Sequence, residues 1–179
     1  VADAMSAASY AAANGYQIVL AKADGSVDAD VLVGDVYIVG GDKWVKDIEG
    51  AERLAGADRF ATNAEVAEGL EYDFGVVYVA NGLSLVDALA VAPLAAMDNA
   101  FVLLCSANDV DVLDSFTAAT QFIAVGGTSA VPNKILDKLA GEDSGEFTIK
   151  PPKAPNLIQL KLELSNTNYV KEDLTDVTN

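Results

Sequence analysis

The sequence predicts an α/β fold in which short parallel sheets are flanked by helices. Short apolar runs alternate with helix-like stretches along most of the chain. These runs are solidly apolar rather than alternating, which is typical of parallel strands buried on both faces. In addition, residues 86–105 and 122–131 resemble residues 1–21 and 36–45, which indicates an internal repeat of roughly 85 residues. The chain is therefore expected to contain related units in tandem.

The first unit, residues 1–50, is expected to be a partial copy of the repeat. Its Ala-rich start favours a helix that ends at Gly15. Asp24-Gly25 is a turn signal, after which Ser26 can cap a short helix. The expected elements are a helix at 2–13, a buried strand at 17–21, a short helix at 27–33, a strand at 36–39 and a helical turn at 44–48. This copy has no counterpart of residues 53–80 and therefore lacks one strand and one helix.

The second unit, residues 51–141, is expected to be a complete copy. Asp58 is a natural N-cap for its first helix. Ser84 and Asp87 have the spacing of a capping box, while Pro93 should kink the helix that follows. The expected helices span 58–70, 85–97, 109–118 (capped by Asn108) and 132–139, and the expected strands span 76–80, 101–105 and 122–125.

Residues 142–179 differ in character from both units. Pro151, Pro152 and Pro155 favour an extended linker. Residues 157–164 then alternate between apolar and polar side chains, which predicts a β-strand with one buried face. This tail would begin another domain or lend its strand to another sheet. Because the partial first copy should expose a sheet edge, we expect the tail strand, another copy or another chain to cover that edge.

The composition excludes several classes of function. A net charge of −16 argues against binding to nucleic acid and to anionic membrane surfaces. The chain contains no histidine, which excludes imidazole bases and histidine-ligated metals. Cys105, the single cysteine, ends an apolar run and is expected to be a buried hydrophobic residue. No apolar run reaches about 18 residues, so no membrane insertion is expected. We therefore predict no catalytic residue, no metal and no cofactor.

Candidate site residues lie where strands lead into helices. Ligands of open α/β sheets bind at the carboxyl ends of strands, and helix N-termini attract anions. The loop residues at such positions are Asn81, Ser84 and Asp87 in the second unit, Gly40 and Gly41 in the first, and Gly126 and Gly127 in the second. Asp87 would oppose an anion and is expected to cap its helix, as Asp3 should in the first copy. The glycine pairs could cradle a phosphate or could simply permit tight turns.

A second group of candidates supplies positive charge. Lys43, Lys46, Arg53 and Arg59 form the clustered basic residues of the two units, and Trp44 lies among them. The arginines are suited to bidentate contact with a phosphate or carboxylate of a polymer, but equally to an internal pair with Asp58 or Asp87. Trp44 could stack on a sugar or pack internally. The aspartates of residues 24–35 lack the spacing of an EF-hand calcium loop.

Three segments carry a family resemblance. Residues 53–62 (RLAGADRFAT), 87–96 (DALAVAPLAA) and 125–131 (VGGTSAV) resemble the signature segments of the type-two cell-wall-binding repeat of Gram-positive surface and S-layer proteins. The resemblance covers one full repeat and part of a preceding one. It implies tandem Rossmann-like α/β units, an extracellular location in the cell wall or S-layer, and non-catalytic, non-covalent anchoring to an anionic cell-wall polysaccharide. It also implies assembly with other copies or neighbouring chains. The family commonly has three copies, whereas this chain has about one and a half.

One alternative function remains open from the sequence. The alternating α/β order also permits a Rossmann-like enzyme or binding domain for a nucleotide or sugar phosphate. The glycine pairs, however, lack the spacing of the Walker and dinucleotide-binding fingerprints. Fold alone does not decide function.

Overall fold

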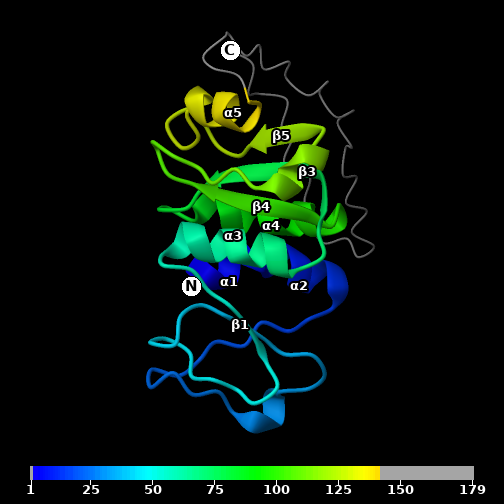
Figure 1. Cartoon of the computed structure of the whole chain (residues 1–179), viewed down its shortest axis with the longest axis vertical. Coiled ribbons are helices and arrows are strands. Elements are labelled where there is room, and N and C mark those ends of the chain that lie inside the picture. Colours follow the sequence, from blue (N-terminus) through cyan, green and yellow to red (C-terminus); the bar gives the residue numbers. More distant parts are fainter. Residues whose placement is uncertain (1, 142–179) are drawn as a thin grey trace, which may run out of the picture. The chain divides into compact units, whose positions relative to one another are not determined.

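The structure is a computed structural model that describes residues 2–141 of the 179-residue chain. Helices and parallel strands alternate in it, as the sequence predicts (Figure 1). The helices are α1 (Ala2–Ser6), α2 (Ala8–Asn14), α3 (Arg59–Gly69), α4 (Val86–Met97) and α5 (Asn133–Leu139), with short 3-10 helices η1 (Ala29–Val31) and η2 (Asp114–Ala118). The strands are β1 (Tyr37–Val39), β2 (Glu52–Leu54), β3 (Asp73–Asn81), β4 (Ala100–Cys105) and β5 (Gln121–Ala124). The predicted tail strand lies outside the described residues.

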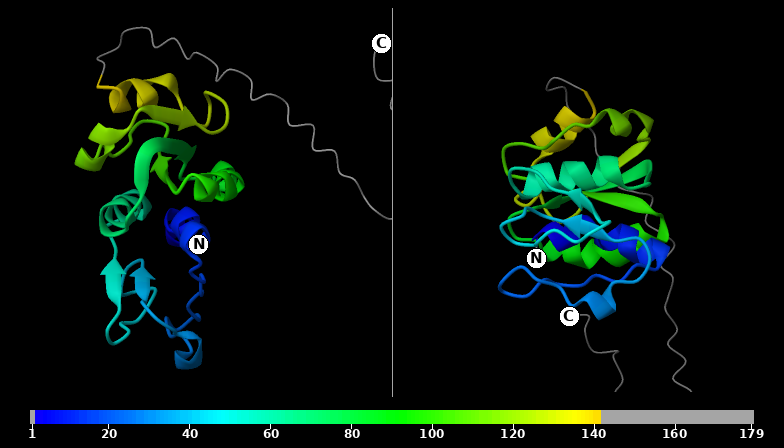
Figure 2. Two further views of the ribbon diagram at one scale, coloured as in Figure 1. Left: turned by 90° about the vertical axis from the view of Figure 1, so that its right-hand side faces the viewer. Right: turned by 60° about the horizontal axis from the view of Figure 1, so that its bottom comes forward.

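The larger sheet has the strand order β4-β3-β5, and both strand pairs are parallel. Along β3, side chains alternate between two apolar cores. Val77 and Val79 pack with residues of α3 and α5, whereas Tyr78 and Ala80 pack with residues of α4. The left view of Figure 2 shows α3 and α4 on opposite sides of the sheet. The prediction of short parallel sheets flanked by helices is therefore confirmed.

The outer edge of β4 is closed by a side chain rather than by a strand. Asn63 of α3 is fully buried. Its Nδ2 donates to the carbonyl oxygen of Val102 (3.1 Å), and its Oδ1 accepts from the N–H of Leu104 (2.8 Å). The amide thus replaces one rung of a β-ladder, and it satisfies two backbone groups that would otherwise be buried without a partner. The sequence pattern gave no indication of this role.

A second, two-stranded sheet pairs β1 with β2 in parallel. Its strands come from the two different sequence units, because β1 belongs to residues 1–50 and β2 to residues 51–141. Leu54 of β2 is buried in the core that α3 covers. We did not predict β2, since Glu52-Arg53-Leu54 has no strand-like pattern.

Several predictions for the first unit are wrong. Residues 17–21 form no strand, and the expected helix at 27–33 is only η1. Ser26 bonds to Asp24 Oδ1 within the turn and makes no cap hydrogen bond to η1. The helix expected at 2–13 is divided at Ala7, although its counterpart α4, which contains Pro93, is continuous. The helical turn expected at 44–48 lies earlier, because residues 42–44 form the turn and residues 46–48 are irregular.

In the second unit the deviations are local. Residues 109–118 contain only η2, and Asn108 caps no helix there. Asp58 is confirmed as the cap of α3, where its Oδ1 accepts from the N–H groups of Phe60 and Ala61, both at 2.9 Å. The capping box at residues 84–87 is wrong. The residue before α4 is Leu85, in the left-handed region at φ 58°, and no side chain caps it.

Candidate functional site

The candidate residues gather in loops that follow the carboxyl ends of the strands, where open α/β folds bind ligands. Polar side chains join several of these loops. Asn81, at the end of β3, accepts with Oδ1 from the N–H groups of Leu83 (2.8 Å) and Ser84 (3.1 Å). Its Nδ2 donates to the carbonyl oxygen of Ala130 (3.1 Å), in the loop after β5. Asn81 thus orders the loop before α4 and joins it to the loop after β5.

The two glycine pairs repeat one arrangement. The first glycine of each pair has a positive φ, 115° at Gly40 and 98° at Gly126. A Cβ on Gly40 would lie 2.8 Å from Oδ2 of Asp3, and one on Gly126 would lie 2.6 Å from Oδ2 of Asp87. Both aspartates rest against the glycine turns. Asp87 makes no cap hydrogen bond to α4, so that prediction is wrong. The second glycines, Gly41 and Gly127, face open space.

This contact bears on the phosphate-cradle hypothesis. A glycine turn binds an anion with its backbone amides. Here a carboxylate already lies against each turn, and it would repel a phosphate at the same place. The arrangement favours the reading in which the glycine pairs permit a tight turn.

Both arginines bond to carbonyl oxygens in the loops. Arg53 donates from Nη1 to Gly40 (2.6 Å) and from Nη2 to Val45 (2.9 Å), and it forms an ion pair with Asp47 (2.8 Å). Arg59 donates from Nη1 to the carbonyl oxygen of Gly82 (2.8 Å). Each arginine therefore has a structural role, as one of our two readings held, but with partners other than Asp58 and Asp87.

The remaining candidates, Trp44, Lys43 and Lys46, are exposed. Trp44 is 74% exposed, so it does not pack internally. Lys46 lies 3.5 Å from Asp24 Oδ2, and Lys43 has no ion pair with a described residue. Trp44, Lys43 and Arg59 line one cleft of about 1750 Å³, whereas Arg53 and Lys46 do not line it. Three of the five predicted polymer-contacting residues therefore line the same cleft. The same cleft is also lined by Lys22 and by four aspartates, Asp3, Asp35, Asp42 and Asp58.

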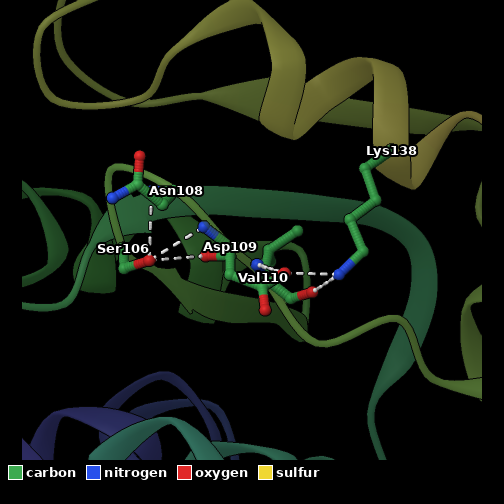
Figure 3. Close-up of polar contacts among 5 residues, drawn as sticks. All are labelled: Ser106, Asn108, Asp109, Val110 and Lys138. Atoms are coloured by element: carbon green, nitrogen blue, oxygen red, sulfur yellow. Dashed lines mark hydrogen bonds and ion pairs between the residues drawn. The ribbon is translucent and has the colours of Figure 1, made fainter. Parts of the chain in front are cut away.

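Hydrogen bonds and an ion pair join the loop after β4, residues 106–110, to Lys138 of α5 (Figure 3). Ser106 Oγ accepts from the N–H groups of Asn108 (3.2 Å) and Asp109 (2.9 Å). Lys138 Nζ of α5 pairs with the Asp109 carboxylate and donates to the carbonyl oxygen of Val110 (2.8 Å). The hydrogen bond from Lys138 and that from the Val110 amide lower the pKa of Asp109. These contacts position residues 106–110 against α5.

This ion pair predicts a pH effect. Because the pKa of Asp109 is lower in the folded chain than its ordinary value of about 4, the stabilisation is fully present above that value and is lost as the pH falls through the folded pKa. The difference in melting temperature between the unmodified chain and Asp109→Asn should therefore be constant above about pH 5 and vanish in stronger acid. Asp111→Asn, at an exposed residue nearby, is the control. A difference that persists at pH 2 would contradict the assignment.

Other chemistry-bearing groups are buried or scattered. Burial raises the pKa of the Cys105 thiol to about 11, which leaves the nucleophilic thiolate unpopulated at neutral pH. Among residues 2–141, no group of three or more carboxylates and thiols is placed to hold a metal ion. The helices in the same part of the chain are all too short or too polar to cross a membrane.

Two curated proteins of Bacillus subtilis (strain 168) are similar in sequence. The amidase enhancer is 28% identical over 165 residues, which covers 83% of this chain and 23% of that protein. The N-acetylmuramoyl-L-alanine amidase LytC is 28% identical over 166 residues, which covers 84% of this chain and 34% of that protein. The chain thus spans about a quarter to a third of the length of these relatives.

Solved structures show a similar fold, and a family model identifies the family. The structure resembles Cwp8 (TM-score 0.63, 24% identity) and Cwp6 (TM-score 0.66, 22% identity) from Clostridium difficile. Each match covers 78% of this chain and about a quarter of the other, 27% and 26%. The model of cell wall binding domain 2 (CWB2) matches residues 1–48 and 53–136, well over half of the sequence. The chain therefore belongs to the cell wall binding domain 2 family.

Proposed function

We propose that this chain is a non-catalytic module that anchors a surface or S-layer protein to an anionic polysaccharide of the cell wall. Membership of the cell wall binding family supports binding to the wall. The observation that carries the proposal further is the exposed Trp44 beside Lys43, in the cleft that Arg59 also lines. An exposed indole offers a flat apolar face for a sugar ring, and the two cations can meet acidic groups of the polymer.

The proposal requires an acidic chain to bind an acidic polymer, so it needs a basic side chain that is not already paired. Most of the basic side chains in residues 2–141 are tied to carboxylates or carbonyl oxygens. Lys43 lies apart from the ion pairs of this region. Since four aspartates also line the cleft, the attraction is local and weak, and added salt should reduce it further.

The absence of a catalytic role is part of the proposal. The amidase relative is an enzyme by its name, but this chain covers only 34% of it. Within the described residues, the single thiol is buried with a raised pKa, and carboxylates occupy the glycine turns that a sugar phosphate would need. These features support a binding role. A rise in melting temperature on addition of nucleotide would instead favour the Rossmann-like alternative.

Co-sedimentation with purified Gram-positive cell walls tests the proposal. The double variant Trp44→Ala, Lys43→Gln should bind walls about tenfold more weakly, because it loses a stacking face and a positive charge. Both side chains are exposed, so the variant should melt at the unchanged temperature. The control is Lys134→Gln, an exposed lysine of α5. Unchanged binding of the double variant would remove Trp44 and Lys43 from the binding surface.

A further inference from the structure

The two sequence units differ in one strand of their sheets. In the second unit, β3 lies between β4 and β5 and pairs with both. By the repeat alignment, residues 17–21 correspond to β4, and β1 corresponds to β5. Residues 1–50 contain no counterpart of β3. If the first unit follows the plan of the second, a strand is missing between residues 17–21 and β1.

The structure has a cleft at that place. The cleft of about 1750 Å³ is lined on one side by residues 17–21 and on the other by residues 36–39. In the left view of Figure 2, the chain that leaves α2 and the strand β1 run past each other with no strand between them. Among the described residues, β1 pairs only with β2. Since alternate residues of a strand direct their backbone groups to opposite sides, the groups of Tyr37 and Val39 are directed away from β2.

Burial differs sharply between the corresponding segments. Val102, Leu103 and Leu104 of β4 are each 1% exposed. Their counterparts Ile18, Val19 and Leu20 are 47%, 41% and 66% exposed. No backbone hydrogen bond joins residues 17–21 to another described residue. Three consecutive large apolar residues with free backbone groups have the properties of a strand edge that awaits a partner.

The backbone that leads into residues 17–21 nevertheless resembles the backbone that leads into β4. The residue that ends the preceding helix region has a positive φ in both copies, 74° at Gly15 and 46° at the corresponding Asn99. Aromatic rings also gather at the start of both sheets. Phe74 of β3 contacts Phe101 (6.1 Å between ring centroids), and Tyr16 lies 5.9 Å from Tyr37 beside the cleft. The counterparts of β3 and of the helix before it are lacking in residues 1–50.

We propose that this cleft binds a parallel β-strand that resembles β3, an extended segment that is apolar on both faces. Its backbone would pair with residues 17–21 on one side and with β1 on the other, so that a four-stranded sheet with β2 at its edge results. Binding by strand addition draws its affinity from main-chain hydrogen bonds and its specificity from side-chain pockets. Ile18 and Leu20 would become buried on one face of the new sheet and Val19 on the other, as in β4.

The test is a graft of the chain's own β3 segment. Residues 73–85 are fused ahead of Val1, so that the grafted strand stands before α1 as β3 stands before α4. We expect hydrogen exchange at the amides that would face the new strand, those of Val19, Ala21, Tyr37 and Val39, to slow at least about tenfold, and the melting temperature to rise by about 5 °C. The same segment, added as a free peptide, should protect the same amides in proportion to its concentration.

Two controls make the outcome decisive. In the first, the graft carries lysine at the positions of Val77 and Val79, and it should give no protection because lysine cannot be buried there. In the second, Leu20→Lys should leave the unfused chain unchanged, since Leu20 is exposed, but should abolish the gain in the fused chain. Absence of protection with the intact graft would overturn the proposal. So would protection in the unfused chain that increases with protein concentration, because a second copy would then occupy the cleft.

Discussion

Replacement of Asn63 by alanine is expected to lower the free energy of unfolding by about 3 kcal/mol, because it leaves two buried backbone groups without a hydrogen-bond partner. The side chain is fully buried, and it alone bonds to the carbonyl oxygen of Val102 and the N–H of Leu104 on the outer edge of β4. Without it, neither group finds water or another partner. Urea denaturation followed by circular dichroism measures the change.

The matched control is Asn108→Ala. Asn108 is exposed and bonds through its side chain to Lys134 (2.9 Å) at the surface, so its replacement should cost less than about 0.5 kcal/mol. Asn63→Asp adds a second comparison, because it keeps the acceptor for Leu104 but loses the donor to Val102. It should be clearly destabilised at neutral pH. A loss below about 1 kcal/mol for Asn63→Ala would show that the edge of β4 does not depend on this amide.

Gly126→Ala is expected to destabilise the chain by a similar amount, about 3 kcal/mol. Gly126 has a φ of 98°, which residues with a Cβ adopt only with strain. The new Cβ would also lie 2.6 Å from Oδ2 of Asp87, so the carboxylate or the turn must move. Differential scanning calorimetry should record a lower melting temperature. Gly127→Ala is the control in the same turn, since its Cβ would meet nothing within 4 Å.

The first unit offers an independent repetition of this experiment. Gly40 has a φ of 115°, and its Cβ would lie 2.8 Å from Oδ2 of Asp3, whereas Gly41 faces open space. Gly40→Ala should therefore be destabilising and Gly41→Ala nearly neutral. Adding Asp87→Ala to Gly126→Ala should recover the part of the loss that comes from the close contact, but not the part from backbone strain. Equal effects of the first and second glycines in both turns would contradict this account.

The elements that could be predicted from sequence are those whose signal is local. Residues 76–80, 101–105 and 122–125 are solid apolar runs, and all became strands. Asp58 caps α3 because its bonds reach only to Phe60 and Ala61. The strand expected at 17–21 failed for a physical reason. A strand exists only when a neighbour pairs with it, and no described segment lies beside this one. β2 was missed for the opposite reason, since it exists only through β1.

At the candidate site, too, features with a local signal could be predicted and those that depend on distant residues could not. That Trp44 and Lys43 share one turn follows from their adjacency in sequence. The roles of Arg53 and Arg59 could not be deduced, because their carbonyl partners at Gly40 and Gly82 lie 13 and 23 residues away. Asn63 gave no signal, since it bonds to residues 39 and 41 positions later. Asp87 has the spacing of a capping residue, and only the fold reveals that it contacts Gly126.

The proposed anchoring to an anionic polymer is tested most directly by removal of that polymer. Co-sedimentation is measured on purified Gram-positive cell walls before and after the secondary polysaccharide is stripped chemically, with the released polymer as a soluble competitor. We expect the chain to bind intact walls, to lose at least about tenfold in affinity for stripped walls, and to be displaced by the free polymer. Binding that is equal on intact and stripped walls, and insensitive to the free polymer, would contradict the proposal.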